Sequence, residues 1–548
     1  MSAASVRPTA GAPSDTAEGR RAVRAWFTPV GIVVAVMTVL ALGLRAYQLS
    51  TPGYLTGITE YDDGSYFGSA IHLVHGIFPY RDFVFVQPPG ITLLMTPVAL
   101  LSKATGTLTA FAVARVLTTI ASAAGVLLLG LLVRHRGLPT TILACGLLAV
   151  YPDAVTTART LLLEPWLVLF CLLGALAVFN GDRVTDSRRR LLAGGLALGF
   201  AGAIEAWAIL PAAVILALCL PPVRRAVRCV AGMAVGFLVP VVPFAALAPG
   251  NFFRDLVTAQ VGPRAGAVRV GIWYRFKEMF GLSNVPAGHG TLIIVTVIIL
   301  GFAIGTLAAA WLVTRQPPAP LEWFALVTTI LVVAIFLYPS QFFFHFVDFL
   351  VPFLAMAVAL PLARLLQAAQ ARADKSGTGD VLRWSAAGLA ALVIAVFALG
   401  EVSAEYHQAH NPAVVGAAAD RARMVSALER DVPSGGCVLT DQVSYTIVAN
   451  RFISTVPGCS TMDDPTGMDL ALGHGLKAGT GAGRVPAVAA VWRDAFQHAQ
   501  FILLSGRSYK RVAWSQSLRT YFHDNFLRML ASDPTGDRLF VRNGVQIR

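Results

Sequence analysis

The chain has 548 residues, of which 56% are hydrophobic and only 13% are charged, and its mean hydropathy is +0.65. Soluble domains carry about 25% charged residues, so this composition excludes a soluble protein and predicts a polytopic α-helical membrane protein. The net charge of +13 does not indicate nucleic-acid binding, because the basic residues fall mostly in short clusters between apolar segments, where cytoplasmic loops collect them.

Residues 1–24 are small and polar and end in arginines, which predicts a disordered cytoplasmic tail rather than a signal peptide. The next apolar segment, 25–44, is long enough to cross a bilayer, which takes about 20 residues. Further spans are predicted near 106–133, 138–152, 160–180, 191–206, 207–221, 226–249, 289–314, 321–339, 341–363 and 382–400.

The short apolar segment 90–102, which Pro97 divides, is left open as a span or an interfacial segment. If it does not cross, the basic clusters all lie on the side of the N-terminus, as cytoplasmic loops require. A transmembrane domain covering 25–400, with about eleven helices, follows from this choice. The N-terminus is then cytoplasmic, and residues 401–548 lie outside the cytoplasm.

Residues 401–548 are less apolar and predict a soluble extracytoplasmic α/β domain. The pattern indicates strands at 438–440 and 501–504 and helices at 417–428 and 487–499. An outside location would permit a disulfide between Cys437 and Cys459; two unpaired buried thiols are the alternative. The acidic residues of this domain have no assignable partner and are expected at the surface or in turns, namely Asp441, Asp463 and Asp464.

Two adjacent carboxylates stand in the first polar loop, residues 45–89. Asp62 and Asp63 precede apolar residues at helical spacing, which predicts a short amphipathic helix lying in the membrane interface. One Asp suffices to cap this helix, and the other is then free to face a cavity. An ionised carboxylate there suits a general base that activates an acceptor hydroxyl, provided that the leaving group is a phosphate and needs no proton. Capping alone is the alternative role.

A phosphate leaving group needs cations instead. Arg81 and the basic residues of the outer loop 250–288, such as Arg275, are candidates, although Arg81 and Asp82 would also suit a local ion pair. Arg115 lies inside an apolar span, where a charge is costly, and either snorkels or serves the cavity. His72 and His75 are interpreted as hydrogen-bonded or solvated histidines rather than metal ligands. No cofactor is predicted, and no residue is assigned to a metal.

The order of these motifs resembles the GT-C superfamily of polyprenyl-phosphate-sugar-dependent glycosyltransferases. It is most similar to the branch that contains protein O-mannosyltransferases and lipid A aminoarabinose transferases. The resemblance covers 25–400 and rests on Asp62-Asp63 after the first span, then His75-Gly76-x-x-Pro-Tyr80-Arg81-Asp82 and Pro88-Pro89-Gly90. Arg115, Arg159 with Glu164, and His345 near a late span also fit the pattern.

The resemblance implies a multi-pass plasma-membrane enzyme that acts on the outer face with inversion. Its donor would be a polyprenyl-phosphate-linked sugar and its acceptor a cell-envelope glycan, lipid or protein. The resemblance implies Asp62 as the base, although many members have Asp-Glu here and the choice between Asp62 and Asp63 is left open. The residues predicted to bind the substrate or the donor phosphate are then Arg115, Arg159, Glu164 and His345, which fit the family's pattern, together with Arg81 and Arg275 from the charge argument. His345 could also simply face water.

Mannose and arabinofuranose both fit as the sugar. The Lys-poor composition and the C-terminal domain are similar to those of actinobacterial members. The alternative from another class is a lipid or solute transporter, in which Arg115 and Glu205 would line a translocation path.

Overall fold

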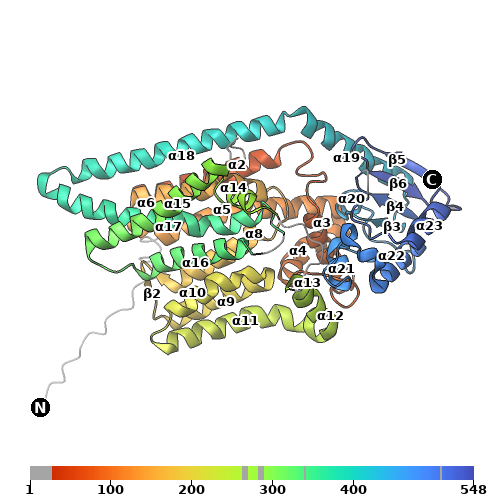
Figure 1. Ribbon diagram of the computed structural model, residues 1–548, viewed down its shortest axis with the longest axis horizontal. Helices are drawn as coiled ribbons and strands as arrows, with labels where there is room; N and C mark the ends of the chain where they lie inside the picture. The colour runs from red at the N-terminus through yellow and green to blue at the C-terminus, as the bar shows by residue number, and fades with distance from the viewer. Residues whose placement is uncertain (1–27, 262–269, 282–288, 339–340, 507–508, 548) are drawn as a thin grey trace, which may run out of the picture.

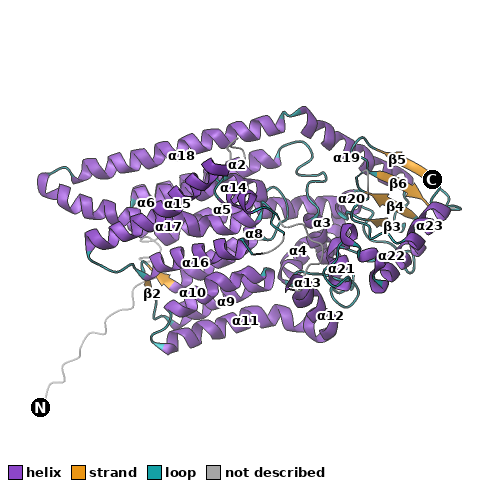
Figure 2. Ribbon diagram, viewed as in Figure 1, coloured by secondary structure: helices purple, strands orange, loops and turns teal. Residues whose placement is uncertain are grey.

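The computed structural model describes residues 28–261, 270–281, 289–338, 341–506 and 509–547. A long helical bundle carries a smaller α/β domain at one end (Figure 1). Nearly all strands gather in that domain, apart from a short hairpin at the far end of the bundle (Figure 2). The predicted tail, 1–24, lies outside the described residues.

A helix occupies every segment for which a membrane span is predicted. The helices of the bundle and its loops are α2 (Pro29–Leu49), α3 (Asp62–Val74), α4 (Gly90–Thr105), α5 (Thr107–Val133), α6 (Leu138–Val150), α7 (Pro152–Thr157), α8 (Glu164–Val178), α9 (Arg188–Ile204), α10 (Ile209–Leu218), α11 (Val223–Leu247), α12 (Pro249–Phe253), α13 (Ala259–Val261), α14 (Ile272–Met279), α15 (His289–Thr314), α16 (Pro320–Phe336), α17 (Phe346–Ala373) and α18 (Gly379–Ala409). Short helical turns are η1 (Arg134–Arg136), η2 (Ala206–Ala208), η3 (Arg254–Thr258) and η4 (Asp374–Ser376), and the hairpin consists of β1 (Phe179–Asn180) and β2 (Arg183–Val184).

Among the described residues, five helices are individually long and apolar enough to cross a membrane: α2, Thr107–Arg136, α11, α17 and α18. Several others are equally apolar but have only 10–17 residues, fewer than the roughly 20 that a perpendicular span needs. One of them is α4, the segment left open above, which contains Pro97 and packs against α3 and α5. The chain is a multi-pass membrane protein.

Glycine pairs bring α9 and α11 into close contact. Gly195 and Gly199 on α9 face Gly232 and Gly236 on α11, and a Cβ atom at Gly195 or Gly199 would lie 2.1 Å from a backbone oxygen of α11. Each pair has the small-xxx-small spacing that lets membrane helices approach at backbone distance. The two helices therefore form one rigid wall of the bundle.

The β1–β2 hairpin lies at the end of the bundle opposite the C-terminal domain (Figure 1), and buried arginines form ion pairs there. Arg136 there donates to Asp182 (2.8 Å) and to Glu322 (3.0 Å). Arg364 donates to the second oxygen of Glu322 (2.9 Å). These ion pairs join four segments at this end of the bundle, namely η1, the β1–β2 hairpin, α16 and α17.

The C-terminal domain is built on a four-stranded sheet of order β3-β4-β6-β5. Strands β3 and β4 pair in parallel, and the other two pairs are antiparallel. The strands predicted at 438–440 and 501–504 are confirmed as β3 and β4, whereas β5 and β6 were not predicted. Its elements are α19 (Pro412–Asp431), β3 (Val438–Thr440), α20 (Ser444–Val448), α21 (Pro465–Leu472), η5 (Ala478–Thr480), η6 (Ala482–Arg484), α22 (Pro486–His498), β4 (Phe501–Leu504), α23 (Gln516–Asn525), β5 (Arg528–Ser532) and β6 (Arg538–Val541). Cys437 and Cys459 form a disulfide beside β3.

Helix α3 forms at the predicted place, but it does not lie exposed in the membrane interface. Its residues from Asp63 to His72 are all buried. The C-terminal domain covers its polar face, where Ser65 donates to the backbone oxygen of Asp463 (2.8 Å) and His72 contacts the Asp463 carboxylate (2.9 Å). The polar side chains of the helix are therefore satisfied by a second part of the chain rather than by water, which the sequence did not predict.

We predict that Gly195→Val destabilises the protein by about 1–3 kcal/mol, the usual cost of overpacking. The added Cβ would meet the backbone oxygen of Cys229 on α11. Thermal unfolding in detergent should show a lower midpoint. Gly388→Val on α18 is the matched control, because its Cβ would meet nothing within 4 Å; equal loss in both variants would contradict the close α9–α11 contact.

Candidate active site

Asp63 is fully buried at the start of α3, and its carboxylate joins several parts of the chain. Its Oδ2 accepts hydrogen bonds from Arg115 Nη2 on α5 (2.8 Å) and from Thr160 Oγ1 (2.6 Å). Its Oδ1 accepts one from Ser444 Oγ in the C-terminal domain (2.8 Å). Both charged side chains of the Asp63–Arg115 pair are 0% exposed. Asp63 therefore belongs to the core of the protein, where a substrate cannot reach it.

Asp62 precedes Asp63 and faces another direction, because neighbouring residues of a helix are about 100° apart around its axis. Its side chain is 38% exposed and lines a large cavity, where its Oδ2 lies 4.0 Å from Nε2 of His345. Nδ1 of His345 lies 2.8 Å from Oε1 of Glu164. Of the two adjacent carboxylates, Asp62 is the one that a ligand can reach.

The electrostatic environment perturbs both groups. Burial in the cavity wall raises the pKa of Asp62 to about 7; His345 opposes this shift, and Asp464 and Glu60 add to it. Burial lowers the pKa of His345, but Glu164 and Asp62 outweigh burial and raise the pKa to about 9. At neutral pH His345 is therefore a cation, and Asp62 is ionised in part of the molecules.

The cavity has a volume of about 1580 Å³ and two chemically different parts. Its apolar part lies along α9, α10, η2 and α11, with the side chains of Leu198, Trp207, Ile209, Met233, Phe237 and Val241. Its polar part combines residues of the bundle with residues of the C-terminal domain: Glu60, Asp62, His345, Asp464, Lys477 and Arg511. The glycine contact between α9 and α11 holds the apolar wall together.

Several residues expected around a donor phosphate lie elsewhere in the structure. Arg81 is exposed and forms an ion pair of 2.7 Å with Asp82, as in the local pairing left open above. Arg275 is buried and donates to the backbone oxygen of Phe336 (2.6 Å). Arg115 is held by Asp63. Each of these arginines has a partner nearby and stands outside the set of described residues that line the cavity.

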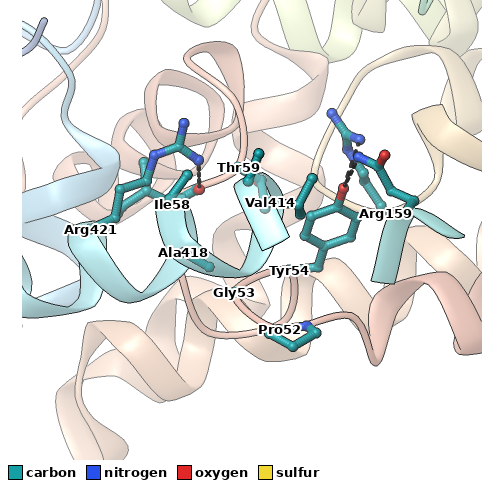
Figure 3. A pocket seen from close by; sticks show the side chains of 12 residues that line it. Pro52, Gly53, Tyr54, Ile58, Thr59, Arg159, Val414, Ala418 and Arg421 are labelled. Atoms are coloured by element: carbon teal, nitrogen blue, oxygen red, sulfur yellow. Dashed lines mark hydrogen bonds between the residues drawn. The ribbon is translucent and has the colours of Figure 1, made fainter. Parts of the chain in front are cut away.

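Arg159 and Glu164 support the cavity from behind its wall. Arg159 donates to Oε1 of Glu60 (2.5 Å) and contacts the hydroxyl of Tyr54 (3.5 Å). It also borders a second, smaller pocket of about 340 Å³, where Figure 3 shows it on the opposite side from Arg421. Glu164 reaches the cavity through His345. Both residues thus position side chains that line the cavity, without lining it themselves.

The C-terminal domain supplies residues that the sequence interpretation missed. Asp441 and Asp463 are buried rather than exposed, because Ser505 donates to the first (2.8 Å) and His72 contacts the second (2.9 Å). Asp464 lines the cavity and accepts a hydrogen bond from Tyr61, 403 positions away (2.8 Å). Contacts over such separations leave no mark in a single sequence, and nothing singles out Lys477 or Arg511.

The histidines of α3 have partners that are not metal sites. His72 contacts Asp463, and His75 contacts the backbone oxygen of Ile71 (2.8 Å). In the part of the chain that the structure describes, no group of three or more His, Cys, Asp or Glu residues is arranged to hold a metal ion.

Comparisons with protein-family models and with curated proteins find no match. Among solved structures, the chain is similar to ArnT from Cupriavidus metallidurans bound to undecaprenyl phosphate, with 15% identity and a TM-score of 0.59 over 92% of this chain and 97% of that chain. It is also similar to the oligosaccharyltransferase of Archaeoglobus fulgidus tethered with an acceptor peptide, with 13% identity and a TM-score of 0.55 over 95% of this chain and 75% of that one. The chain has the GT-C fold.

At these identities the likeness establishes the fold, and the site has to be argued from this chain. The similarity extends into the C-terminal domain, since the alignment with ArnT covers 92% of the chain. The first loop of this GT-C protein, with its two aspartates, lies between the bundle and that domain.

We predict that substituting Asp63 destabilises the protein and that substituting Asp62 does not. Asp63→Ala leaves Arg115 as an unpaired buried charge, which typically costs about 3–5 kcal/mol. Asp62→Ala removes a carboxylate that faces the cavity and should leave stability unchanged. Thermal unfolding of the purified variants measures this difference. A midpoint lowered equally in both variants would contradict the assignment of Asp63 to structure and Asp62 to the cavity.

Proposed function

We propose that the protein is an inverting glycosyltransferase that moves a sugar from polyprenyl phosphate to a hydroxyl group of a cell-envelope acceptor. The observation that carries this proposal is the position of Asp62, whose carboxylate lies 4.0 Å from the His345 imidazole in the polar part of a cavity that continues into an apolar groove. A base beside a cationic side chain, next to a groove for a lipid, matches this reaction.

The apolar part of the cavity suits the prenyl chain of the donor. Its wall carries large apolar side chains, including Phe237 and Trp207, and burying each CH₂ group of a lipid there is worth about 0.8 kcal/mol. The prenyl chain would lie along α9 and α11 and direct its phosphate and sugar to the polar part. The fold shared with ArnT, whose structure holds undecaprenyl phosphate, supports this arrangement.

In the reaction, the Asp62 carboxylate takes the proton of the acceptor hydroxyl as its oxygen attacks the anomeric carbon. The bond between that carbon and the phosphate oxygen breaks, and polyprenyl phosphate leaves with the bonding electron pair. Attack opposite the leaving group inverts the anomeric centre. The phosphate departs without a proton, so one general base is enough.

His345 and Glu164 keep Asp62 competent as a base. The cationic imidazole favours the ionised carboxylate 4.0 Å away. Glu164, in turn, favours the protonated form of His345 through their 2.8 Å contact. Without this cation, the pKa of Asp62 would rise above its value of about 7, and a smaller share of the enzyme would carry an ionised base at neutral pH.

The proposal includes the sidedness, the sugar and the acceptor. The C-terminal domain and the cavity face the outside, and the end with the arginine clusters faces the cytoplasm, in agreement with the positive-inside pattern. A disulfide such as Cys437–Cys459 is typical of the oxidising side. The sugar is mannose or arabinofuranose, and the acceptor is a glycan, lipid or protein of the envelope.

The transporter alternative rested on two charged residues, Arg115 and Glu205, and only Glu205 lines the cavity. Arg115, which would line a translocation path, is fully buried against Asp63. Glu205 does line the cavity, as a lipid-binding groove also allows. Flux of a prenyl-linked sugar into proteoliposomes without transfer to an acceptor would favour the transporter.

We predict that Asp62→Asn lowers the transfer rate by about 10²–10⁴-fold, the usual contribution of a general base, while the protein stays folded. The assay uses purified full-length protein, radiolabelled polyprenyl-phosphate mannose or arabinofuranose, and extracted envelope acceptors. Asp494→Asn, at a side chain that is 66% exposed on α22, is the matched control and should keep full activity. Full activity of Asp62→Asn would remove Asp62 from the role of base.

We further predict that the rate of the wild-type enzyme rises with pH and levels off above about pH 7, because Asp62 must lose its proton to act and its pKa is about 7. In His345→Gln this rise should move to higher pH, since the imidazolium lowers the pKa of Asp62. A pH–rate profile of both proteins measures the shift. An unmoved profile with a uniformly lower rate would indicate that His345 acts only through structure.

A further inference from the structure

A donor phosphate in the cavity needs positive charge, and the described part of the bundle offers little. Among the described residues that line the cavity, the basic side chains are His345, Lys477 and Arg511. His345 is engaged with Glu164 and Asp62. Lys477 and Arg511 both belong to the C-terminal domain.

Arg511 lies directly against the catalytic loop. Its guanidinium stands 4.7 Å above the ring of Tyr61, the residue that precedes Asp62. Its Nη1 donates to Ser505 Oγ (2.8 Å) and to Gln442 Oε1 (3.1 Å). Both partners are neutral, and no described carboxylate forms an ion pair with the guanidinium within 4.0 Å. Ser505 also donates to Asp441 (3.0 Å); burial raises the pKa of Asp441 to about 6, and the charge of Arg511 opposes this shift. The guanidinium is therefore held in place without a direct ion pair among the described residues, and an anion in the cavity can contact it.

Lys477 reaches the same wall from another loop. Burial raises the pKa of Asp464, and hydrogen bonds from Gly467 and Tyr61 together with the charge of Lys477 oppose this shift. The hydroxyl of Tyr61 donates to Asp464 at 2.8 Å. Lys477 and Arg511 thus line the same cavity as Asp62, and Arg511 stacks on Tyr61, the residue that precedes Asp62.

We propose that Lys477 and Arg511 bind the phosphate of the lipid-linked donor, so that the C-terminal domain supplies the phosphate-binding part of the active site. This inference rests on the proposed function. It assigns to the C-terminal domain the role that Arg81, Arg115 and Arg275 do not fill, because those side chains are paired elsewhere. The membrane bundle then provides the base and the groove for the lipid.

The negative charge on the phosphate increases during the reaction, which strengthens its interaction with Lys477 and Arg511. The phosphate of the donor is a diester with one negative charge, and cleavage of the bond to the sugar produces a monoester that carries up to two. Fixed cations interact more strongly with the second state, so they stabilise the departing phosphate more than the bound donor. Lys477 and Arg511 should therefore bind polyprenyl phosphate, the product, at least as tightly as the donor.

The experiment measures the affinity of full-length protein in detergent for undecaprenyl phosphate. We expect Lys477→Gln and Arg511→Gln each to weaken binding about tenfold or more, as the loss of a charge-assisted hydrogen bond does, and the double variant to weaken it further. Asp62→Asn should bind like the wild type. Lys510→Gln is the matched control, because Lys510 is exposed beside Arg511 in the sequence and should leave affinity unchanged.

Arg511→Lys provides a second variant in case a glutamine variant loses its fold. It keeps the charge and should retain part of the affinity, but not the fork-shaped hydrogen bonding of arginine. Thermal unfolding checks that each protein is folded before its affinity is compared.

The outcomes separate the two proposals. If the wild type does not bind undecaprenyl phosphate, the proposed function fails. If the wild type and Asp62→Asn bind it and the folded double variant binds it equally well, the phosphate assignment is overturned and the glycosyltransferase proposal stands. If the double variant raises the KM for the acceptor and leaves that for the donor unchanged, the two cations serve the acceptor and the assignment is likewise overturned.

Discussion

The buried carboxylate of Asp63 accepts hydrogen bonds from Arg115 on α5, from Thr160 before α8 and from Ser444 in the C-terminal domain. A buried ion pair is tolerated only when its remaining hydrogen-bonding capacity is satisfied, and removing one partner is costly. The pair therefore fixes the start of α3 against three other segments. Once Asp63 is held in the core, the geometry of the helix turns Asp62 towards the cavity.

The same contacts make the C-terminal domain part of the site rather than an appendage. Tyr61 donates to Asp464, Ser65 donates to the backbone of Asp463, and Arg511 stacks on Tyr61. The first loop is thus enclosed between the bundle and the domain, which explains why α3 is buried although its sequence is amphipathic. An active site built in this way needs both parts of the chain in place before its base and its cations face the same cavity.

Local pattern was enough to predict the helices of the bundle, the position of α3 and the strands β3 and β4, because apolar length and periodicity are properties of short segments. The glycine spacing of α9 and α11 is also a local signal, and it indicates close packing of two membrane helices. The partner of Arg115 and the role of Asp464 were not readable, since they depend on contacts between distant positions. For Arg81, the sequence alone does not decide between an ion pair with the neighbouring Asp82 and binding of a donor phosphate.

The most direct test of this account is an experimental structure of the full-length protein with undecaprenyl phosphate. The account requires Asp63 in the core with Arg115 and Asp62 facing the cavity. It predicts the prenyl chain along α9 and α11, and the phosphate within hydrogen-bonding distance of Arg511 or Lys477. A phosphate bound at Arg81 outside the cavity, or a loop in which Asp62 takes the place of Asp63 in the core, would contradict it.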